Sequence, residues 1–137
     1  PRAMFQKYIP GREFTCAVLE IRGRATPLPP TEIIAKKSFF DYEAKYTAGA
    51  SEEITPPHLP EKQIRAIQKL AAKVHLLCDC RGYSRTYFIL VKDNRFYILD
   101  IKTLPGLTET SLVPQAARAA GITFPRLLDI IIEAALS

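Results

Sequence analysis

The stretch that decides the fold reads Tyr-Ser-Arg-Thr-Tyr-Phe-Ile-Leu-Val over residues 83–91, Lys-Asp-Asn over 92–94 and Arg-Phe-Tyr-Ile-Leu-Asp-Ile over 95–101. Two runs rich in aromatic and β-branched residues flank a short polar segment, which is the pattern of a β-hairpin. The sequence therefore predicts two antiparallel strands here, and a sheet built around them.

Pairing within this hairpin predicts which side chains share a face. Antiparallel pairing about Asp93 brings Tyr87 opposite residue 99 or 100, and side chains two residues apart on a strand point the same way. We therefore expect Tyr87, Asp100 and Lys102 to lie together on one face of the hairpin.

Further strands are expected before the hairpin. Residues 13–21 read as a buried strand followed by a tight turn at 22–24, and residues 31–35 read as a short strand. Residues 38–60 contain one Gly, three Pro residues and little periodicity, which predicts a long loop. Within it, residues 41–59 are expected to be the least ordered part of the chain.

Three helices are expected around these strands. Apolar residues spaced three and four apart after Pro60 predict an amphipathic helix that ends near Leu77. A second helix would end before Gly121, and Thr123 can cap a third. The predicted fold class is α+β, an antiparallel sheet with helices packed on it.

Composition excludes several classes of function. The chain has 137 residues and a formal net charge of +5, but no basic run is longer than two residues, which argues against a nucleic-acid binder and favours anionic ligands such as phosphates. No apolar run approaches the roughly 20 residues that a membrane helix needs. Three cysteines are too few for a disulfide framework or a four-ligand zinc site, and they fit a reducing, cytoplasmic compartment. The start at Pro1, without an initiator Met, favours a piece of a longer protein.

Four stretches carry a resemblance to a known family when they are taken together in order and spacing. They are Gly-Arg-Glu-Phe-Thr (11–15), Phe-Phe-Asp-Tyr-Glu-Ala-Lys-Tyr (39–46), Cys-Arg-Gly-Tyr-Ser-Arg (80–85), and Thr-Leu-Pro-Gly-Leu-Thr (103–108) running into Ser-Leu-Val-Pro (111–114). This set resembles the C-terminal part of the D-alanine–D-alanine ligases, which are ATP-grasp enzymes. The resemblance implies that residues 1–137 form one ATP-grasp lobe, and that the N-terminal and central domains of the family are absent from this chain.

The resemblance also implies a reaction. Family members join two D-alanines with ATP and Mg²⁺ for peptidoglycan precursor synthesis: an acyl phosphate forms on the first D-alanine, and the amine of the second attacks it. The enzymes are usually homodimers. Because the nucleotide would sit between the central lobe and this one, the chain offers half a cleft, and we expect it to be inactive by itself.

Individual site residues follow from the same resemblance. Those implied for ATP are Gln6, Lys7, Tyr8 and Ile9 on a strand that meets the adenine, Glu13 at the ribose, Phe39, Ile89 and Leu99 around the base, and Lys45 at the phosphates. Those implied for the reaction are Arg85 and the Gly106 backbone at the oxyanion, and Tyr46, Ser111 and Leu112 at D-alanine.

Physical chemistry gives these assignments a reason and leaves alternatives. Phosphoryl transfer depends on positioning and on positive charge, which Lys45 and Arg85 would supply. A glycine at 106 lets backbone N–H groups approach an oxyanion closely. From the residues alone, the favoured interpretation is that Lys45 is an ordinary solvated lysine and that Arg85 pairs with Asp100 across the hairpin, and the resemblance shifts the balance to the functional roles.

The sequence departs from the family at the expected metal site. The family pattern is Arg-x-Asp followed by Glu-x-Asn-Thr, whereas this chain has Arg85-Thr-Tyr87 and Asp100-Ile-Lys102-Thr. Of the three metal positions, only Asp100 keeps a carboxylate, and a charged lysine has no lone pair with which to ligate Mg²⁺. Two interpretations stay open: Lys102 replaces part of the charge of the metal, or the site has decayed.

Two classes of function therefore compete. The first is a lobe of an ATP-dependent ligase for cell-wall precursors. The second is a degenerate ATP-grasp module that is retained for binding or regulation. An ATP-grasp ligase with other substrates is a weaker third, because the Asp-Tyr-Glu-Ala-Lys-Tyr run is specific to the D-alanine family.

Overall fold

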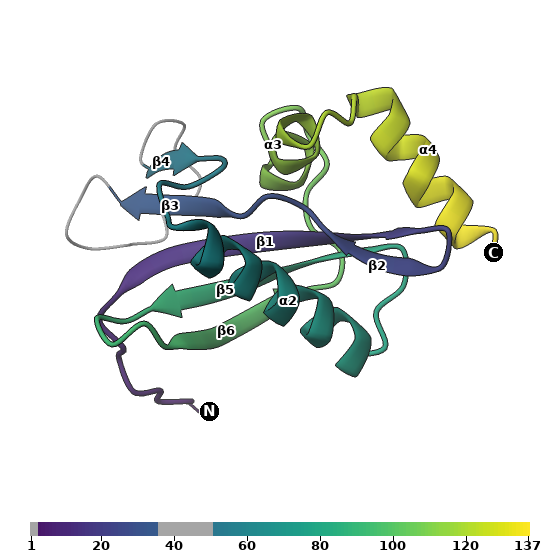
Figure 1. The fold of residues 1–137 in the computed structure, drawn as a ribbon. Coiled ribbons are helices and arrows are strands. Elements are labelled where there is room, and N and C mark those ends of the chain that lie inside the picture. The colour runs from purple at the N-terminus through teal and green to yellow at the C-terminus, as the bar shows by residue number, and fades with distance from the viewer. Residues whose placement is uncertain (1–2, 36–50) are drawn as a thin grey trace.

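A six-stranded antiparallel sheet forms the centre of the computed structural model, which describes residues 3–35 and 51–137 (Figure 1). The strand order is β4-β3-β1-β5-β6, with β2 paired to β1 beside β3. The strands are β1 Arg12–Ile21, β2 Arg24–Pro27, β3 Thr31–Ala35, β4 Ser51–Ile54, β5 Tyr83–Leu90 and β6 Phe96–Lys102, and the helices are α2 Glu61–Leu77, α3 Leu112–Ala119 and α4 Phe124–Ala135. The predicted α+β fold class is confirmed.

The central strand β1 separates two apolar clusters because its side chains alternate between the faces of the sheet. On one face, Phe14 and Val18 pack with Phe88 of β5 and with Ile67 of α2. The other face carries a second cluster, which joins β1 to α3 and α4 through Ala17, Leu19, Tyr83, Val113 and Leu127. Both faces of β1 are covered, which explains why its sequence reads as a continuous apolar run rather than an alternating one.

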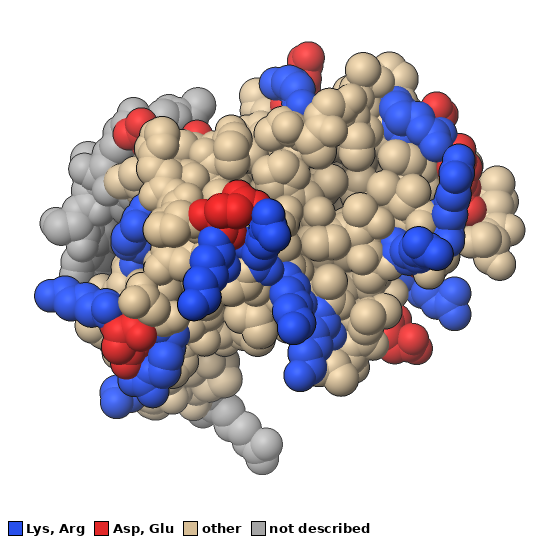
Figure 2. All heavy atoms as spheres, in the orientation of Figure 1, with Lys and Arg blue, Asp and Glu red and all other residues tan. Residues whose placement is uncertain are grey.

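Helix α2 buries apolar side chains against the sheet and exposes charged side chains to solvent. Ile67 and Ala71 are fully buried against the sheet, whereas Lys62, Lys69 and Lys73 are exposed. Figure 2 shows Lys and Arg side chains gathered along the outer surface of this helix. The spacing of three and four residues predicted this amphipathic helix, and the prediction is confirmed.

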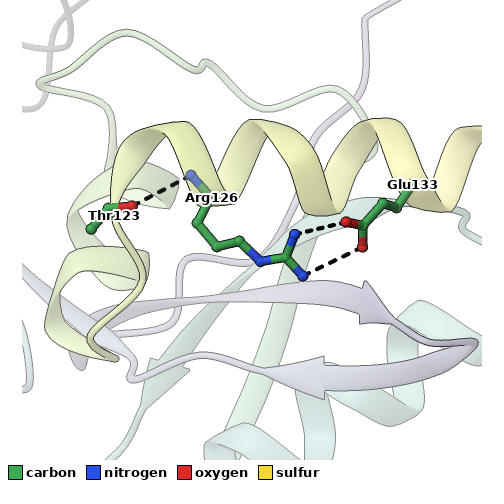
Figure 3. Close-up of polar contacts among 3 residues, drawn as sticks. All are labelled: Thr123, Arg126 and Glu133. Atoms are coloured by element: carbon green, nitrogen blue, oxygen red, sulfur yellow. Dashed lines mark hydrogen bonds and ion pairs between the residues drawn. The ribbon is translucent and has the colours of Figure 1, made fainter.

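Helix α4 begins with a side-chain cap. The Thr123 hydroxyl accepts a hydrogen bond from the backbone N–H of Arg126 at 3.4 Å, as predicted for this residue (Figure 3). The Arg126 guanidinium then reaches along the helix to the Glu133 carboxylate at 2.7 Å. Leu127 and Ile130 face the sheet, so these polar contacts lie on the solvent side.

The β5–β6 hairpin has the predicted pairing, with one irregularity. Arg85 lies opposite Lys102 and Tyr87 opposite Asp100, but the next pair is Phe88 with Ile98, so Leu99 is an extra, unpaired residue. This β-bulge keeps Asp100 and Lys102 on the face of Tyr87, which confirms the predicted shared face.

Two expectations about elements were wrong, and one strand was not predicted. Residues 38–60 were expected to be loop throughout, but β4 lies within them and pairs with β3. Residues 24–27 form the unpredicted strand β2, paired with the end of β1. Both strands have four residues, and neighbouring strands decide their conformation more than their own weak propensity does. Finally, residues 6–9 were expected on a strand, but they pair with no strand of the described chain, and Tyr8 is 84% exposed.

Residues 41–59 were expected to be the least ordered part of the chain, and residues 41–50 of this segment lie outside the described residues. None of the described helices combines the length and the apolar composition required to cross a bilayer.

Candidate functional site

Four polar side chains from β5 and β6 form a cluster on the face of the sheet opposite α2. These are Arg85, Tyr87, Asp100 and Lys102, which we call the hairpin cluster. Arg85 donates a hydrogen bond to the Tyr87 hydroxyl, and its guanidinium carbon lies 4.9 Å from the centre of the Tyr87 ring. The Lys102 ammonium pairs with the Asp100 carboxylate at 2.6 Å. The alternative pairing of Arg85 with Asp100 is therefore not the one that forms.

The electrostatics of the cluster follow from this pairing. The hydrogen bond from Lys102 to Asp100, and then the charge of that carboxylate, raise the pKa of Lys102 above its ordinary value. Arg85 and Lys102 each carry one positive charge and Asp100 one negative charge, so the cluster has a net charge of +1. The Nε atom of Arg85 is buried and has no hydrogen-bond partner within residues 3–35 and 51–137.

The donor set does not fit Mg²⁺. That ion requires oxygen ligands in a nearly ideal octahedral arrangement. The Asp100 carboxylate is occupied by an ammonium, Tyr87 accepts a hydrogen bond from a guanidinium, and Lys102 offers only donors. No group of three or more His, Cys, Asp or Glu side chains able to hold a metal occurs in the described parts of the chain. The cluster is a cationic site rather than a metal site.

The loop after β6 returns to the strand that carries Arg85. The Tyr83 hydroxyl donates to the carbonyl oxygen of Pro105 at 3.4 Å, which places the neighbouring Gly106 near the start of β5. A Cβ atom on residue 106 would lie 3.0 Å from the Ser111 hydroxyl oxygen, so the loop is tight there. The Ser111 hydroxyl also accepts from the backbone N–H of Thr108 at 3.1 Å, and Leu112 is buried at the start of α3.

Two of the residues expected around adenine and ribose, Glu13 and Ile89, lie further along the same face. Glu13 of β1 is the direct partner of Ile89 of β5, and Ile89 pairs with Tyr97 of β6. Ile89 is 7% exposed, while Leu99, at the bulge, is 49% exposed. The structure therefore brings Glu13 and Ile89 together, and their roles stay predictions.

A wide groove of about 980 Å³ lies at the opposite end of the hairpin from Lys102. It is lined by Lys7, Tyr8 and Ile9, by Arg12 of β1, and by Arg95 and Tyr97 near the turn. Gln6 is exposed and does not line it. The four residues of the hairpin cluster do not line this groove. The size of the groove alone therefore does not identify where the chemistry takes place.

Sequence reasoning missed one anchor of this groove. The Arg12 guanidinium binds the Glu32 carboxylate through two hydrogen bonds of 2.7 and 2.8 Å, and Glu32 is 5% exposed. This contact with Glu32 raises the pKa of Arg12. Alternation along residues 12–14 and 31–33 was the available signal, because it places both side chains on the face of Phe14 once the two strands pair.

Three predicted site residues lie outside the described residues. These are Phe39, Lys45 and Tyr46, all in the segment between β3 and β4.

The fold is that of the C-terminal lobe of an ATP-grasp protein. A family model described as D-ala D-ala ligase C-terminus matches residues 1–133, and the chain belongs to this family. It is 46% identical to the D-alanine–D-alanine ligase of Pelotomaculum thermopropionicum over 138 aligned residues, and 47% identical to that of Desulfotalea psychrophila over 135. These alignments cover 99% and 97% of the chain but only 42% of either relative.

Solved structures show the same likeness. The D-alanine–D-alanine ligase of Bacillus anthracis complexed with ATP matches with a TM-score of 0.76 and 37% identity, over 96% of this chain and 41% of that one. A D-Ala:D-Ser ligase from Enterococcus faecalis matches with a TM-score of 0.81 and 29% identity, over 93% of this chain and 37% of that one. The chain thus spans about 40% of the length of the ligases that it resembles.

Proposed function

We propose that this chain forms one wall of an ATP-grasp cleft and binds ATP along the face of β1, β5 and β6 opposite α2. One observation carries the proposal: Glu13 and Ile89 share this face with the hairpin cluster. At about 3.3 Å per residue along β5, Ile89 and Arg85 are about 13 Å apart, a distance that an extended ribose and triphosphate span. The ATP complex of the similar ligase from B. anthracis supports this reading.

In this proposal the base lies near Ile89 and Leu99, and the ribose hydroxyls bond to Glu13. Lys7, Tyr8 and Ile9 border the adenine, and Phe39 and Lys45 approach the nucleotide from the segment before β4. Arg85 and the Gly106 backbone face the developing oxyanion, where positive charge and N–H donors stabilise a transition state. Tyr46, Ser111 and Leu112 contact the amino-acid substrate, D-alanine.

The substrate of the whole protein is part of the same proposal. The relatives from P. thermopropionicum and D. psychrophila are named as D-alanine–D-alanine ligases, so we assign D-alanine and peptidoglycan precursor synthesis in the cytoplasm. The complete enzyme would be a homodimer that also contains N-terminal and central domains.

This chain alone is not expected to ligate D-alanine. It supplies one wall of the cleft, and its hairpin cluster lacks the oxygen ligands that Mg²⁺ requires. The test incubates the chain with ATP, Mg²⁺ and D-alanine, follows phosphate release and dipeptide formation, and measures ATP binding by calorimetry. The complete P. thermopropionicum ligase is the positive control. We expect ATP binding without dipeptide, and an absence of ATP binding under every condition would contradict the proposal.

One observation favours the second candidate function, a degenerate ATP-grasp module retained for binding or regulation. The Asp100–Lys102 ion pair occupies the single carboxylate that remains at the expected metal positions. D-alanyl-D-alanine formation at ordinary enzyme rates would exclude this candidate and would favour an active ligase.

A further inference from the structure

We propose that the hairpin cluster binds the phosphates of the nucleotide directly, without a divalent cation, and that Mg²⁺ weakens this binding instead of supporting it. The inference rests on the proposed function, because it concerns the same face of β5 and β6. It goes beyond that function by assigning a metal-free polyphosphate as the ligand and Lys102 as its principal contact.

The first observation is that two cationic side chains lie opposite each other on neighbouring strands. Arg85 and Lys102 are direct partners across neighbouring strands. Like charges in directly opposite positions of a sheet repel and lower its stability. An anion bound between the two side chains removes this repulsion, so the pair is more favourable with a phosphate present than without one.

The way in which Arg85 is held is the second observation. A tyrosine, not a carboxylate, receives its hydrogen bond and lies under its guanidinium. Tyr87 therefore restrains the arginine without cancelling its charge, whereas an aspartate at this position would form a neutral pair. The positive charge of Arg85 remains available to an anionic ligand.

Access and charge balance complete the argument. The side chains of Lys102 and Asp100 are 54% and 48% exposed, so a ligand can reach the ammonium. Lysine has three donors, and Asp100 accepts from one of them. The net charge of +1 resides on the protein itself, so no bound metal is needed to make the face attractive to phosphate.

Mg²⁺ weakens the binding of a polyphosphate to the hairpin cluster. When Mg²⁺ binds a polyphosphate, it cancels part of the negative charge and occupies oxygen atoms that Lys102 and Arg85 would otherwise contact. The protein offers the ion a carboxylate that is already paired. Mg²⁺ thus competes with the cluster for the ligand.

Calorimetric titrations of the 137-residue chain test the proposal, with ATP and with inorganic tripolyphosphate, each in EDTA and each in excess Mg²⁺. We expect both ligands to bind more tightly in EDTA. A charge-assisted hydrogen bond contributes enough that Lys102→Met should weaken binding in EDTA by about tenfold. The matched control is Lys73→Met, which removes the same charge from the exposed surface of α2 and should leave the affinity within about twofold because distant surface charges are screened.

Asp100→Asn gives the sharpest contrast. If Asp100 were a metal ligand, its loss would weaken binding in Mg²⁺. In our proposal the substitution releases Lys102 from its ion pair and strengthens binding of tripolyphosphate in EDTA. This variant also decides the case if Lys102→Met fails to fold, which circular dichroism of each variant would reveal.

The outcomes separate the two proposals. Binding that requires Mg²⁺, equal losses in Lys102→Met and Lys73→Met, or weaker binding by Asp100→Asn in EDTA would each overturn the metal-free inference and leave the ATP-binding function standing. If neither ligand binds in either condition, the proposed function itself fails.

Discussion

The two faces of the β5–β6 hairpin carry different kinds of side chain. On the α2 side, Phe88 and Leu90 are buried with Phe14 and Ile67 in an apolar cluster. On the other side, Arg85 and Lys102 stand beside an Asp100 that is already paired. The first face of the hairpin belongs to the apolar core under α2, and the second carries the positions at which the sequence departs from the family pattern.

This contrast shows that the fold and the chemistry of this lobe depend on different side chains. The sheet and helices are similar to those of the solved ligase from B. anthracis, with a TM-score of 0.76. Tyr87 and Lys102 stand at positions where the resemblance implies metal ligands, and both lie outside the apolar cluster under α2. A shared fold therefore supports the family assignment but not, by itself, the activity.

Phe88→Ala should produce the largest loss of stability. Phe88 is 1% exposed, and its truncation leaves a cavity, so we expect a loss of about 3–5 kcal/mol in the free energy of unfolding. Urea denaturation measures the effect. Ile98→Ala, at the half-exposed partner position on β6, is the control and should cost much less. Similar losses in both variants would mean that the burial of Phe88 in the cluster under α2 does not set its contribution to stability.

Gly11→Ala tests the close contact that joins β1 to the end of β5. A Cβ atom there would lie 2.6 Å from the Leu90 carbonyl oxygen, and the strands would have to separate. We expect a loss of roughly 1–3 kcal/mol, as for other overpacked sites. The exposed neighbour Pro10 provides the control, since Pro10→Ala should leave the thermal midpoint almost unchanged. A midpoint for Gly11→Ala equal to that of the unmodified chain would contradict this close approach of the two strands.

Thr123→Ala tests the helix that covers part of the site-bearing face. Loss of the cap hydrogen bond to the Arg126 N–H should lower stability by about 1 kcal/mol. Thr123→Ser keeps a hydroxyl and should restore most of the difference in the same denaturation experiment. If serine gives no more stability than alanine, the hydroxyl is not the cap.

His75 of α2 is a titratable side chain buried between this helix and the sheet, and it should make the stability of the chain depend on pH. It is 2% exposed, it shares a 2.8 Å hydrogen bond with Ser84, and burial lowers its pKa below the usual histidine value of about 6.5, with Glu20 acting weakly in the other direction. The unfolded chain therefore binds more protons than the folded one just below that value.

Stability should consequently fall as the pH is lowered from about 7 through 6.5 and level off below the folded pKa. Denaturation midpoints between pH 7.5 and 5 measure the change, which should be absent in His75→Gln and retained in His58→Gln, because His58 is exposed. A profile that is the same in His75→Gln as in the unmodified chain would assign the pH dependence to other groups.

Much of the fold could be predicted because strong patterns coincide with buried elements. The apolar run before Arg22 forms β1, and the residues after Pro60, whose apolar side chains are spaced three and four apart, form α2. The short strands β2 and β4 could not be predicted, because their conformation depends on pairing with β1 and β3.

The candidate site was predictable in position but not in its contacts. Alternation placed Tyr87, Asp100 and Lys102 on one face, yet it could not reveal the bulge at Leu99 that keeps them there. The choice of Lys102 over Arg85 as the partner of Asp100 depends on side-chain geometry that spacing does not specify. The strand expected at residues 6–9 failed because no described strand pairs with that segment.

The most direct test of the central claim, that substitutions on the site-bearing face removed the metal site, is the dependence of ATP affinity on Mg²⁺ concentration. The measurement compares the unmodified chain with the Tyr87→Asp/Lys102→Asn double variant, which restores oxygen ligands beside Asp100. We predict that Mg²⁺ strengthens ATP binding only in the double variant and weakens it in the unmodified chain. Strong Mg²⁺-dependent binding by the unmodified chain would contradict the account.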